Sequence, residues 1–371
     1  MVPVHYHEGC FPPEESLDWG ALVPLLGPAI AALARYDGVL AAIPNPDLLL
    51  APLTAQEAVL SSRIEGTQAT MGEVLEFEAG QEVDSPDRRD DIEEVLNYRA
   101  ATREAEKMLN EFPLSVRVVR AAHRVLLSGV RGRNKSPGEY RRIPNWIGPP
   151  GCSIDTATFV PIGAEKLDGA MSAWEHYIHQ DTPDLLVQAA VLHAEFEALH
   201  PFLDGNGRLG RMLVPLFLWQ RGLISRPMFY ISAYFEAHRD AYYDGLLAVS
   251  RDDDWTGWCK FFLEGVRMQA EDNLAKARAI LDLYEEMKRR VAELTRSHYA
   301  VHALDWMFER PIFSTASFVA WAGIPKHTAR RVLGVLRRSG ILSVVRAGGG
   351  RRSTILSFPA LVNIAEGRKL F

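Results

Sequence analysis

The sequence predicts a mainly α-helical protein that carries one short β-hairpin and ends in a small domain of mixed α and β structure. Three observations lead to this prediction. Apolar side chains recur at helical spacing over long stretches of the first 293 residues. Two short apolar runs around proline and glycine interrupt these stretches. Residues 298–371 then combine three helical segments with two β-rich runs.

Helical spacing is clearest in segments where apolar side chains cover one face and polar side chains the other. The long segments of this kind are Arg88–Asn110, Val116–Ser128, Pro183–Leu199, Arg208–Arg221 and Trp255–Glu293. A shorter helix is predicted over Ala55–Glu65, with Gly66 at the position where a helix often ends. The first forty or so residues carry no pattern from which we predict an element.

The predicted hairpin lies in the middle of the chain. It consists of Ile143–Gly148, a Pro-Pro-Gly turn and Ala157–Pro161. Proline and glycine limit such runs to short, irregular strands. This hairpin either binds a ligand or is a surface hairpin without a partner.

Length and cysteine content set the broad class of the protein. With 371 residues the chain exceeds one typical domain and can bury a large core. Cys10, Cys152 and Cys259 lie far apart, lack metal-binding spacing and suit a reducing compartment. We find no signal-peptide pattern at the N-terminus and no run of the roughly 18 apolar residues that span a bilayer. We therefore expect a cytoplasmic protein.

Charge divides the chain into an acidic body and a basic end. Residues 298–371 contain eleven Lys or Arg against three Asp or Glu, whereas the remainder contains 30 against 44. Helices are predicted in the basic end at Tyr299–Phe308, Thr315–Ala322 and Lys326–Arg338, and β-rich runs at Gly340–Val345 and Thr354–Phe358. A basic domain on an acidic protein is a reason to consider nucleic acid as a partner.

The order of these C-terminal elements resembles a winged helix-turn-helix domain. The resemblance implies that the Lys326–Arg338 helix enters the major groove of DNA and that the Gly348–Arg352 loop touches its backbone. A module that docks proteins or forms dimers is the alternative. A DNA partner and a homodimer therefore both stay open.

The most informative segment is the run His-Pro-Phe-Leu-Asp-Gly-Asn-Gly-Arg-Leu-Gly-Arg from His200 to Arg211. It brings a proton acceptor, a carboxylate, a glycine-rich turn and two arginines into twelve residues. Glycine allows backbone conformations in which successive N–H groups converge on one anion. A helix that begins at Arg208 would direct its N-terminal dipole at the same anion.

The run resembles the signature of the Fic family, His-Pro-Phe-x-(Asp/Glu)-Gly-Asn-Gly-Arg-x-x-Arg, at every fixed position. The resemblance implies a Fic-type helical bundle that transfers AMP from ATP to a Ser, Thr or Tyr hydroxyl of a protein target or of itself. It implies that His200 is the general base and that Asp204 holds Mg²⁺. The Gly205–Asn206–Gly207 turn would then hold the α-phosphate, and Arg208 and Arg211 the β- and γ-phosphates.

These roles agree with the chemistry of the residue types. The ordinary histidine pKa of about 6.5 leaves much of the imidazole neutral at cellular pH, as a general base requires. Mg²⁺ often keeps several waters, so one carboxylate and phosphate oxygens can suffice. The planar guanidinium of arginine forms paired hydrogen bonds with phosphate oxygens.

A second segment, Ser61-Ser62-Arg63-Ile64-Glu65-Gly66, resembles the inhibitory motif (Ser/Thr)-x-x-x-Glu-(Gly/Asn) of Fic proteins. The resemblance implies that Glu65 pairs with Arg211 and keeps it from the γ-phosphate. A carboxylate and a phosphate bind the same face of a guanidinium, so they compete for it. Some family members also remove AMP with this glutamate, and that activity stays open here.

Two further segments are similar to parts of Fic proteins. In that family a hairpin at the place of Ile143–Pro161, called the flap, aligns the target by strand-like backbone pairing. The segment Ala233–Tyr243 begins a helix that borders the adenine in similar proteins, and Tyr242 and Tyr243 are candidates for stacking on it, although aromatic pairs on helices are more often core residues. Some relatives carry an asparagine one or two turns later, near the place of Ser250 here, which leaves the base preference open.

The resemblance and the element pattern together predict four regions. These are an N-terminal helical region at 1–110 with the inhibitory helix at about 55–66, a catalytic core at 111–275, a connecting helix at 276–297 and a winged-helix domain at 298–371. Two alternatives to an AMP-transferring enzyme stay open. His193, Glu197 and His200 share one helical face and could bind zinc, although zinc-protease spacing is absent. The chain could also be a DNA-binding transcriptional regulator whose Fic site only senses nucleotide.

Overall fold

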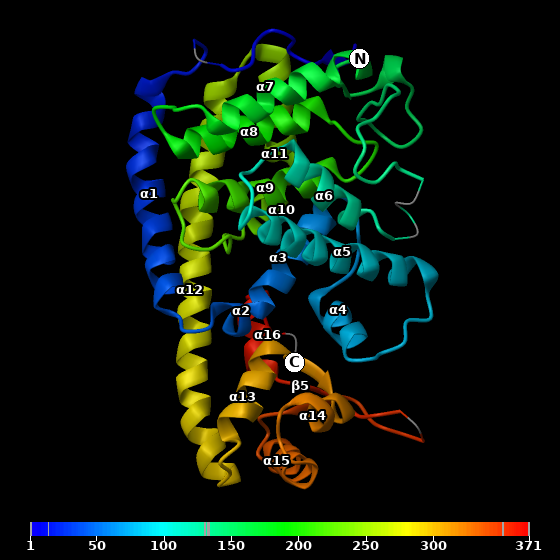
Figure 1. The fold of residues 1–371 in the computed structure, drawn as a ribbon, viewed down its shortest axis with the longest axis vertical. Helices are drawn as coiled ribbons and strands as arrows, with labels where there is room; N and C mark the ends of the chain where they lie inside the picture. Colours follow the sequence, from blue (N-terminus) through cyan, green and yellow to red (C-terminus); the bar gives the residue numbers. More distant parts are fainter. Residues whose placement is uncertain (1, 14, 130, 132–133, 351, 370–371) are drawn as a thin grey trace. The chain divides into compact units, whose positions relative to one another are not determined.

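The computed structural model describes residues 2–13, 15–129, 131, 134–350 and 352–369. Figure 1 shows the order of its helices and strands. The chain forms two compact units, and each is described by itself. The first consists of Met1–Asp37, Leu60–Gly66 and Leu96–Glu271, and the second of Gly38–Val59, Thr67–Val95 and Asp272–Phe371.

This division differs from the four regions expected from the sequence. Residues 1–110 contribute to both units, and the boundary near residue 275 falls inside one continuous helix, α12 (Trp255–Thr295). The helices whose residues belong to both units are α1 (Trp19–Ala42), α3 (Ala51–Ile64), α5 (Pro86–Leu109) and α12. Hydrophobic periodicity identifies a helix but not which unit each of its turns joins, so the sequence pattern could not give this division.

Most of the first unit is helical. Its further elements are β1 (Val4–His5), α6 (Val116–Leu126), β2 (Phe159–Val160), α7 (Leu167–His179), α8 (Leu185–Leu199), α9 (Asn206–Gln220), α10 (Ser232–Ala237) and α11 (Arg239–Asp252), with short 3-10 turns at Ile154–Thr156 and Ala164–Lys166. The predicted helices at 88–110, 116–128, 183–199, 208–221 and 255–293 are confirmed to within about two residues at each end. Helices α1 and α7 were not predicted.

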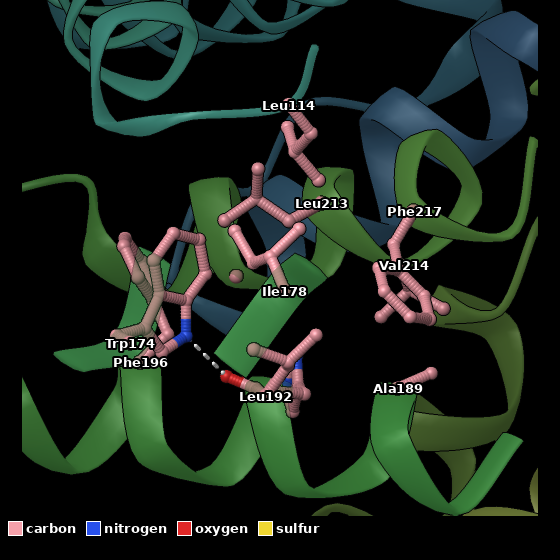
Figure 2. Close-up of a pocket in the computed structure, with 11 residues that line it drawn as sticks. Leu114, Trp174, Ile178, Ala189, Leu192, Phe196, Leu213, Val214 and Phe217 are labelled. Carbon is pink, nitrogen blue, oxygen red and sulfur yellow. Dashed lines mark hydrogen bonds between the residues drawn. The ribbon is translucent and has the colours of Figure 1, made fainter. Parts of the chain in front are cut away.

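Helix α8 lies at the centre of the first unit, as its apolar sequence predicted. It packs against α7 and α9, and nearly all of its residues are buried. Asp184 caps its N-terminus by accepting hydrogen bonds from the N–H groups of Leu186 and Val187 at 2.8 and 3.0 Å. Figure 2 shows the apolar side chains between these helices, where the Trp174 indole donates to the carbonyl of Leu192 at 2.9 Å. They leave a void of only about 10 Å³.

The N-terminal segment forms a strand that the sequence did not indicate. Strand β1 pairs in parallel with β2, with Val4 opposite Phe159. Glu195 of α8, which is fully buried, accepts hydrogen bonds from the hydroxyl of Tyr6 at 2.6 Å and the ring of His7 at 2.8 Å. A buried carboxylate needs such partners, so this cluster fixes the N-terminus on the first unit.

The predicted hairpin is present only in reduced form. Ile147 and Phe159 form one antiparallel bridge, and the remaining pairing of β2 is with β1. Pro144, Pro149 and Pro150 lack the N–H group that a longer ladder would need, which explains the short pairing.

The length of α1 bears on the expectation that no segment could span a membrane. By length and composition, Trp19–Ala42 is apolar enough to cross one. Core helices of soluble proteins and signal sequences meet the same criterion, so this property alone is weak evidence for membrane insertion.

The second unit contains the C-terminal elements. These are α13 (Ala300–Glu309), β3 (Ile312–Ser314), α14 (Thr315–Trp321), α15 (Lys326–Arg338), β4 (Ser343–Arg346), β5 (Ile355–Ser357) and α16 (Pro359–Glu366), joined by α2 (Pro46–Leu49) and α4 (Met71–Glu78). The three strands form an antiparallel sheet in the order β3-β5-β4. The predicted bounds of α15 are confirmed, whereas β3 and α16 were not predicted. Arg351 of the predicted loop lies outside the described residues.

We expect Tyr6→Phe to destabilise the fold, because it leaves one oxygen of the buried Glu195 carboxylate without its partner. An unmet buried acceptor typically costs about 1–3 kcal/mol. Urea unfolding of the full chain measures this change. The matched control is His5→Ala, whose side chain is exposed and should change the free energy of unfolding by less than about 0.5 kcal/mol. Equal stability of the two variants would show that the cluster does not anchor the N-terminus.

Candidate active site

The loop that joins α8 to α9 carries the central motif. His200 follows α8 directly, in a left-handed backbone conformation with φ of 46°. Gly205, with φ of +80°, precedes α9, which begins at Asn206 rather than at the expected Arg208. Glycine adopts this φ without steric cost. Gly205 therefore forms the turn that precedes α9. The N–H groups in the first turn of that helix have no acceptor within the helix itself.

The side chain of Asn206 closes this loop on itself. Its Oδ1 accepts from the Phe202 N–H at 2.9 Å, and its Nδ2 donates to the Phe202 carbonyl at 2.9 Å. We expected Asn206 to contact a nucleotide. The side chain is instead buried and engaged within the loop, which leaves its backbone N–H in the first turn of α9 for a ligand.

His123 of α6 supports the same loop from behind. Its Nδ1 accepts from the Gly138 N–H at 2.7 Å, so its Nε2 carries the proton and donates to the Asp204 carbonyl at 3.0 Å. The ring stacks on Phe202 with centroids 3.8 Å apart. Burial lowers the pKa of His123 to about 4, so the ring is neutral near pH 7. His123 therefore holds the loop without adding charge to it.

His200 is also neutral near pH 7. Burial lowers its pKa to about 4, although the nearby Glu65 charge acts in the opposite direction. Its Nδ1 lies 3.4 Å from the Glu197 carbonyl. The buried guanidinium of Arg141 donates to the His200 carbonyl at 2.9 Å and so caps the end of α8. These contacts position an imidazole that can accept a proton.

Arg211, in the second turn of α9, is the most deeply buried cation of the site, at 1% exposure. Its guanidinium donates to the hydroxyl and the carbonyl of Ser61 at 3.0 and 2.8 Å, and to Glu65 Oε1 at 2.7 Å. Burial opposes the charge of Arg211, but the Glu65 carboxylate raises its pKa above the ordinary value. Burial would likewise raise the pKa of Glu65, and Arg211 holds it below its usual range. The sequence-predicted pair of Glu65 and Arg211 is thus in contact.

The Glu65 carboxylate lies directly over the first turn of α9. A Cβ added to Gly207 would stand 2.2 Å from Glu65 Oε1 and 3.1 Å from Arg211 Nη1, so a larger residue would force the carboxylate to shift. The carboxylate therefore occupies a position where helix N–H groups and a guanidinium both favour an anion. Glu65 follows α3 directly, and Arg239 donates to the carbonyl of Ile64 at 2.7 Å, which fixes that helix end.

Asp204 and Arg208 form a separate pair. The closest approach of their side chains is 3.3 Å, and the Asp204 side chain is 41% exposed. Because Asp204 is open to solvent and only loosely held, its carboxylate is accessible to a cation.

A cavity of about 590 Å³ opens beside the loop. Of the sequence-predicted residues, its lining includes Glu65, His200, Gly207, Arg211, Tyr242 and Tyr243. Flap residues on either side of the Ile147–Phe159 bridge form another wall of the cavity. Ser61, Asp204, Gly205, Asn206 and Arg208 are not part of the lining. The structure thus brings a neutral imidazole, a buried guanidinium and a helix N-terminus to one cavity large enough for a small ligand.

The two tyrosines of α11 differ in environment. Tyr242 is buried, and its hydroxyl lies 2.9 Å from Nε2 of His193, so most of its ring belongs to the core. Tyr243 is 40% exposed and lines the cavity, and the Arg239 guanidinium lies over its ring at 5.8 Å from the centroid. Ser250 does not line the cavity, because its hydroxyl lies 2.7 Å from the ring of His7.

His193, Glu197 and His200 do not converge on a metal. His193 contacts Tyr242 and stacks on Trp258, and burial lowers its pKa to about 3. Burial raises the pKa of Glu197 to about 8. Among the described residues, no group of three or more His, Cys, Asp or Glu side chains is placed to hold a metal ion.

Several residues of the site had no sequence signal. Arg141, His123 and Arg239 act on the backbone of loops and helix ends, and such contacts leave no periodicity or spacing in a sequence. Glu197 shares a helical face with His200, and this spacing suggested that Glu197 binds a metal. In the structure Glu197 lines the cavity.

Solved structures of similar fold are Fic proteins. A Fic family protein from Desulfovibrio desulfuricans G20 aligns with a TM-score of 0.58 at 20% identity, over 91% of this chain and 95% of that one. A Fic domain-containing signaling protein from Bacteroides thetaiotaomicron aligns with a TM-score of 0.54 at 20% identity, over 68% of this chain and 96% of that one. At these identities the likeness concerns the fold alone.

Two curated relatives share segments of sequence with this chain. A probable protein adenylyltransferase of Aquifex aeolicus is 33% identical over 73 residues, which cover 20% of this chain and 23% of the relative. The protein adenylyltransferase Fic of Culex quinquefasciatus is 28% identical over 170 residues, which cover 44% of this chain and 30% of the relative. The chain thus matches less than a third of the length of either protein.

Family models match the N-terminal region and the middle of the chain. The Fic/DOC family N-terminal model matches residues 23–107, and the Fic/DOC family model matches residues 113–218, the segment that contains the whole central motif. Together the two models cover just over half of the sequence. With these matches, and with His200, Gly207 and Arg211 at one cavity, this chain belongs to the Fic/DOC family.

Proposed function

We propose that this chain is an autoinhibited protein adenylyltransferase. It transfers AMP from ATP to a Ser, Thr or Tyr hydroxyl of a protein target or of itself. The observation that carries the proposal is the Glu65 carboxylate over the first turn of α9, bonded to Arg211 at 2.7 Å beside His200. An anion is favoured at this position. In the Fic family the anion is the triphosphate of ATP, from which AMP is transferred.

In the proposed reaction, the uncharged ring of His200 takes the proton of the acceptor hydroxyl through Nε2. The hydroxyl oxygen forms a bond to the α-phosphorus, the bond from that phosphorus to the bridging oxygen breaks, and pyrophosphate leaves. N–H groups of the Gly205–Gly207 turn and of the first turn of α9 stabilise charge on the α-phosphate. Arg211 holds the end of the triphosphate, and Arg208 assists from the same helix.

Asp204 would hold Mg²⁺ in this scheme. Its carboxylate is partly exposed and close to the turn, and it contacts Arg208 at 3.3 Å. A single carboxylate with phosphate oxygens and water satisfies the usual needs of this ion. When bound, Mg²⁺ neutralises phosphate charge.

Inhibition follows from competition for one guanidinium. Glu65 and the γ-phosphate cannot both bond the same face of Arg211, so the carboxylate must leave before the triphosphate binds productively.

We also propose that Tyr243, with its exposed ring, borders the adenine, and that Tyr242 supports it from the core. Removal of AMP, with Glu65 placing a water, is compatible with the same geometry and is the second reaction to test.

We further propose that the C-terminal elements form a winged helix-turn-helix domain. Helices α13, α14 and α15 and the sheet β3-β5-β4 occur in the order that such a domain requires.

A cytoplasmic location fits the three cysteines, which are all free thiols.

Replacing Glu65 with glycine should increase AMP transfer strongly, because it frees Arg211 for the γ-phosphate. Incubation with α-labelled ATP and Mg²⁺, followed by intact-mass analysis, would show label and a gain of one AMP. His200→Ala in the same background should lower the rate by a factor on the order of 10² to 10⁴. Glu111→Gly, an equal change at an exposed turn, is the control. If neither Glu65→Gly nor the native chain gains label, the enzyme proposal fails.

Ser61→Ala should release the inhibition only in part. It removes the hydrogen bond from Arg211 Nε to the Ser61 hydroxyl and leaves the carbonyl and Glu65 contacts in place. We expect a rise in labelling on the order of ten-fold, as for the loss of one hydrogen bond to a charged group, and below that of Glu65→Gly. A fall in labelling would indicate that Ser61 serves catalysis instead of inhibition.

The activity of Glu65→Gly should be nearly independent of pH from about 7 down to about 5.5. The pKa of His200 is about 4, and loss of the Glu65 charge lowers it further, so the base stays unprotonated over this range. An ordinary histidine would lose half of its activity near pH 6.5. Single-turnover rates at saturating ATP measure the profile, and a midpoint near 6.5 would contradict the assignment of a buried, neutral base.

A further inference from the structure

One carboxyl group of the cavity has no role in the reaction proposed above. Glu197 of α8 lies three residues before His200 and lines the cavity with it. Its side chain is only 11% exposed. Its Oε1 is buried and has no hydrogen-bond partner among the described residues. Because buried polar atoms nearly always have a partner, this carboxyl group suits a ligand that enters the cavity.

Glu197 is enclosed where α8 packs against α9. A Cβ added to Gly210 of α9 would clash with Glu197 Oε1, so glycine at this position lets the two helices close around the carboxyl group. On its own helix, Nε2 of His193 lies 4.0 Å from Glu197 Oε1. His193 is neutral near pH 7 and its Nε2 contacts the Tyr242 hydroxyl, so it does not form an ion pair with Glu197.

The charges around Glu197 show that it lies near the phosphate end of the proposed nucleotide site. Burial raises the pKa of Glu197 to about 8, with the Arg211 charge acting in the opposite direction and the Glu65 charge in the same direction. The other ionisable groups near it are all uncharged at pH 7, and they are His193 and His200 of α8 and Tyr242 and Tyr243 of α11. Glu197 is therefore mostly protonated near pH 7, and a protonated carboxyl group can donate a hydrogen bond.

We propose that Glu197 binds the nucleotide: its neutral carboxyl group donates a hydrogen bond to a β- or γ-phosphate oxygen of ATP after Glu65 has left. This inference rests on the proposed function, because it requires a triphosphate beside Arg211. The incoming phosphate charge replaces the charge of Glu65, so the carboxyl group stays protonated in the complex.

Loss of the proton reverses the effect of Glu197 on the ligand. An ionised carboxylate repels the phosphates and competes with them for Arg211. The affinity for ATP therefore falls as pH rises through the pKa of Glu197. Glu65 blocks the site by occupying it, whereas Glu197 controls affinity from the wall of the cavity.

The test uses the full chain with Glu65→Gly, in which no inhibitory carboxylate competes with ATP. Labelling with α-labelled ATP and Mg²⁺ gives KM for ATP and kcat between about pH 6.5 and about pH 9. Loss of the Glu65 charge lowers the pKa of Glu197 from about 8, which brings its ionisation into this range. We expect KM to rise with pH, approaching about ten-fold per pH unit above the pKa. The rate at saturating ATP should change little.

Two variants at position 197, each made with Glu65→Gly, separate the donor from the charge. Glu197→Gln keeps a donor that cannot ionise, so KM should stay low and independent of pH. Glu197→Met has a similar volume but no donor, and it should raise KM on the order of ten-fold near pH 6.5 with kcat little changed. Glu111→Gln, the same change at an exposed turn, should leave KM and its pH profile as they are.

Folding of these variants is checked by urea unfolding. Replacing an unpartnered buried oxygen with an apolar group should leave the free energy of unfolding equal or higher, so Glu197→Met should fold. A purely structural role predicts the opposite, with lower stability and unchanged KM.

Binding of AMP, measured by calorimetry, locates the contact. AMP lacks the β- and γ-phosphates, so Glu197→Met should leave its affinity unchanged. An equal loss of affinity for AMP and ATP would overturn a contact with the end of the triphosphate.

The remaining outcomes distinguish this inference from the proposed function. If Glu65→Gly gains label but its KM does not change with pH, or if Glu197→Met leaves KM unchanged, the role of Glu197 is wrong and the adenylyltransferase proposal stands. If Glu65→Gly neither gains label nor binds ATP, the adenylyltransferase proposal fails and this inference fails with it.

Discussion

The site is organised around one constraint: a buried guanidinium must have an anion beside it. Arg211 is almost fully removed from water, and an unpaired charge there would be strongly destabilising. The structure meets this requirement with the Glu65 carboxylate and the hydroxyl and carbonyl of Ser61. Any ligand that displaces Glu65 must therefore bring negative charge of its own. In the proposed function, inhibition and substrate recognition follow from this same electrostatic demand.

The loop that carries the motif is rigid for reasons that lie outside the motif. Asn206 bonds both backbone groups of Phe202, His123 bonds the carbonyl of Asp204, and Arg141 caps the end of α8. The flap wall of the cavity is supported in a similar way. Strand β1 pairs with β2, and the buried Glu195 holds the residues that follow β1. Residues far from the motif in sequence thereby set the positions of the groups that face the ligand.

The parts of the fold that follow from local rules could be predicted from the sequence. Amphipathic spacing gave the long helices of the core and the bounds of α15, and the motif gave Glu65, His200 and Arg211 as neighbours. What could not be predicted depends on contacts between distant segments. Strand β1 has two residues and no pattern of its own, and β3 forms only because β5 is beside it. Asn206 was expected to bind ligand, since a motif shows which residue types are present but not which of them hold the loop.

The close approach of Glu65 to Gly207 limits how this site can be modified. A methyl group at position 207 would stand 2.2 Å from Glu65 Oε1, so the carboxylate would have to move away from the first turn of α9. In the proposed inhibition, release of Glu65 therefore depends on the α3 side, on residues that hold the carboxylate, while the first turn of α9 stays unaltered.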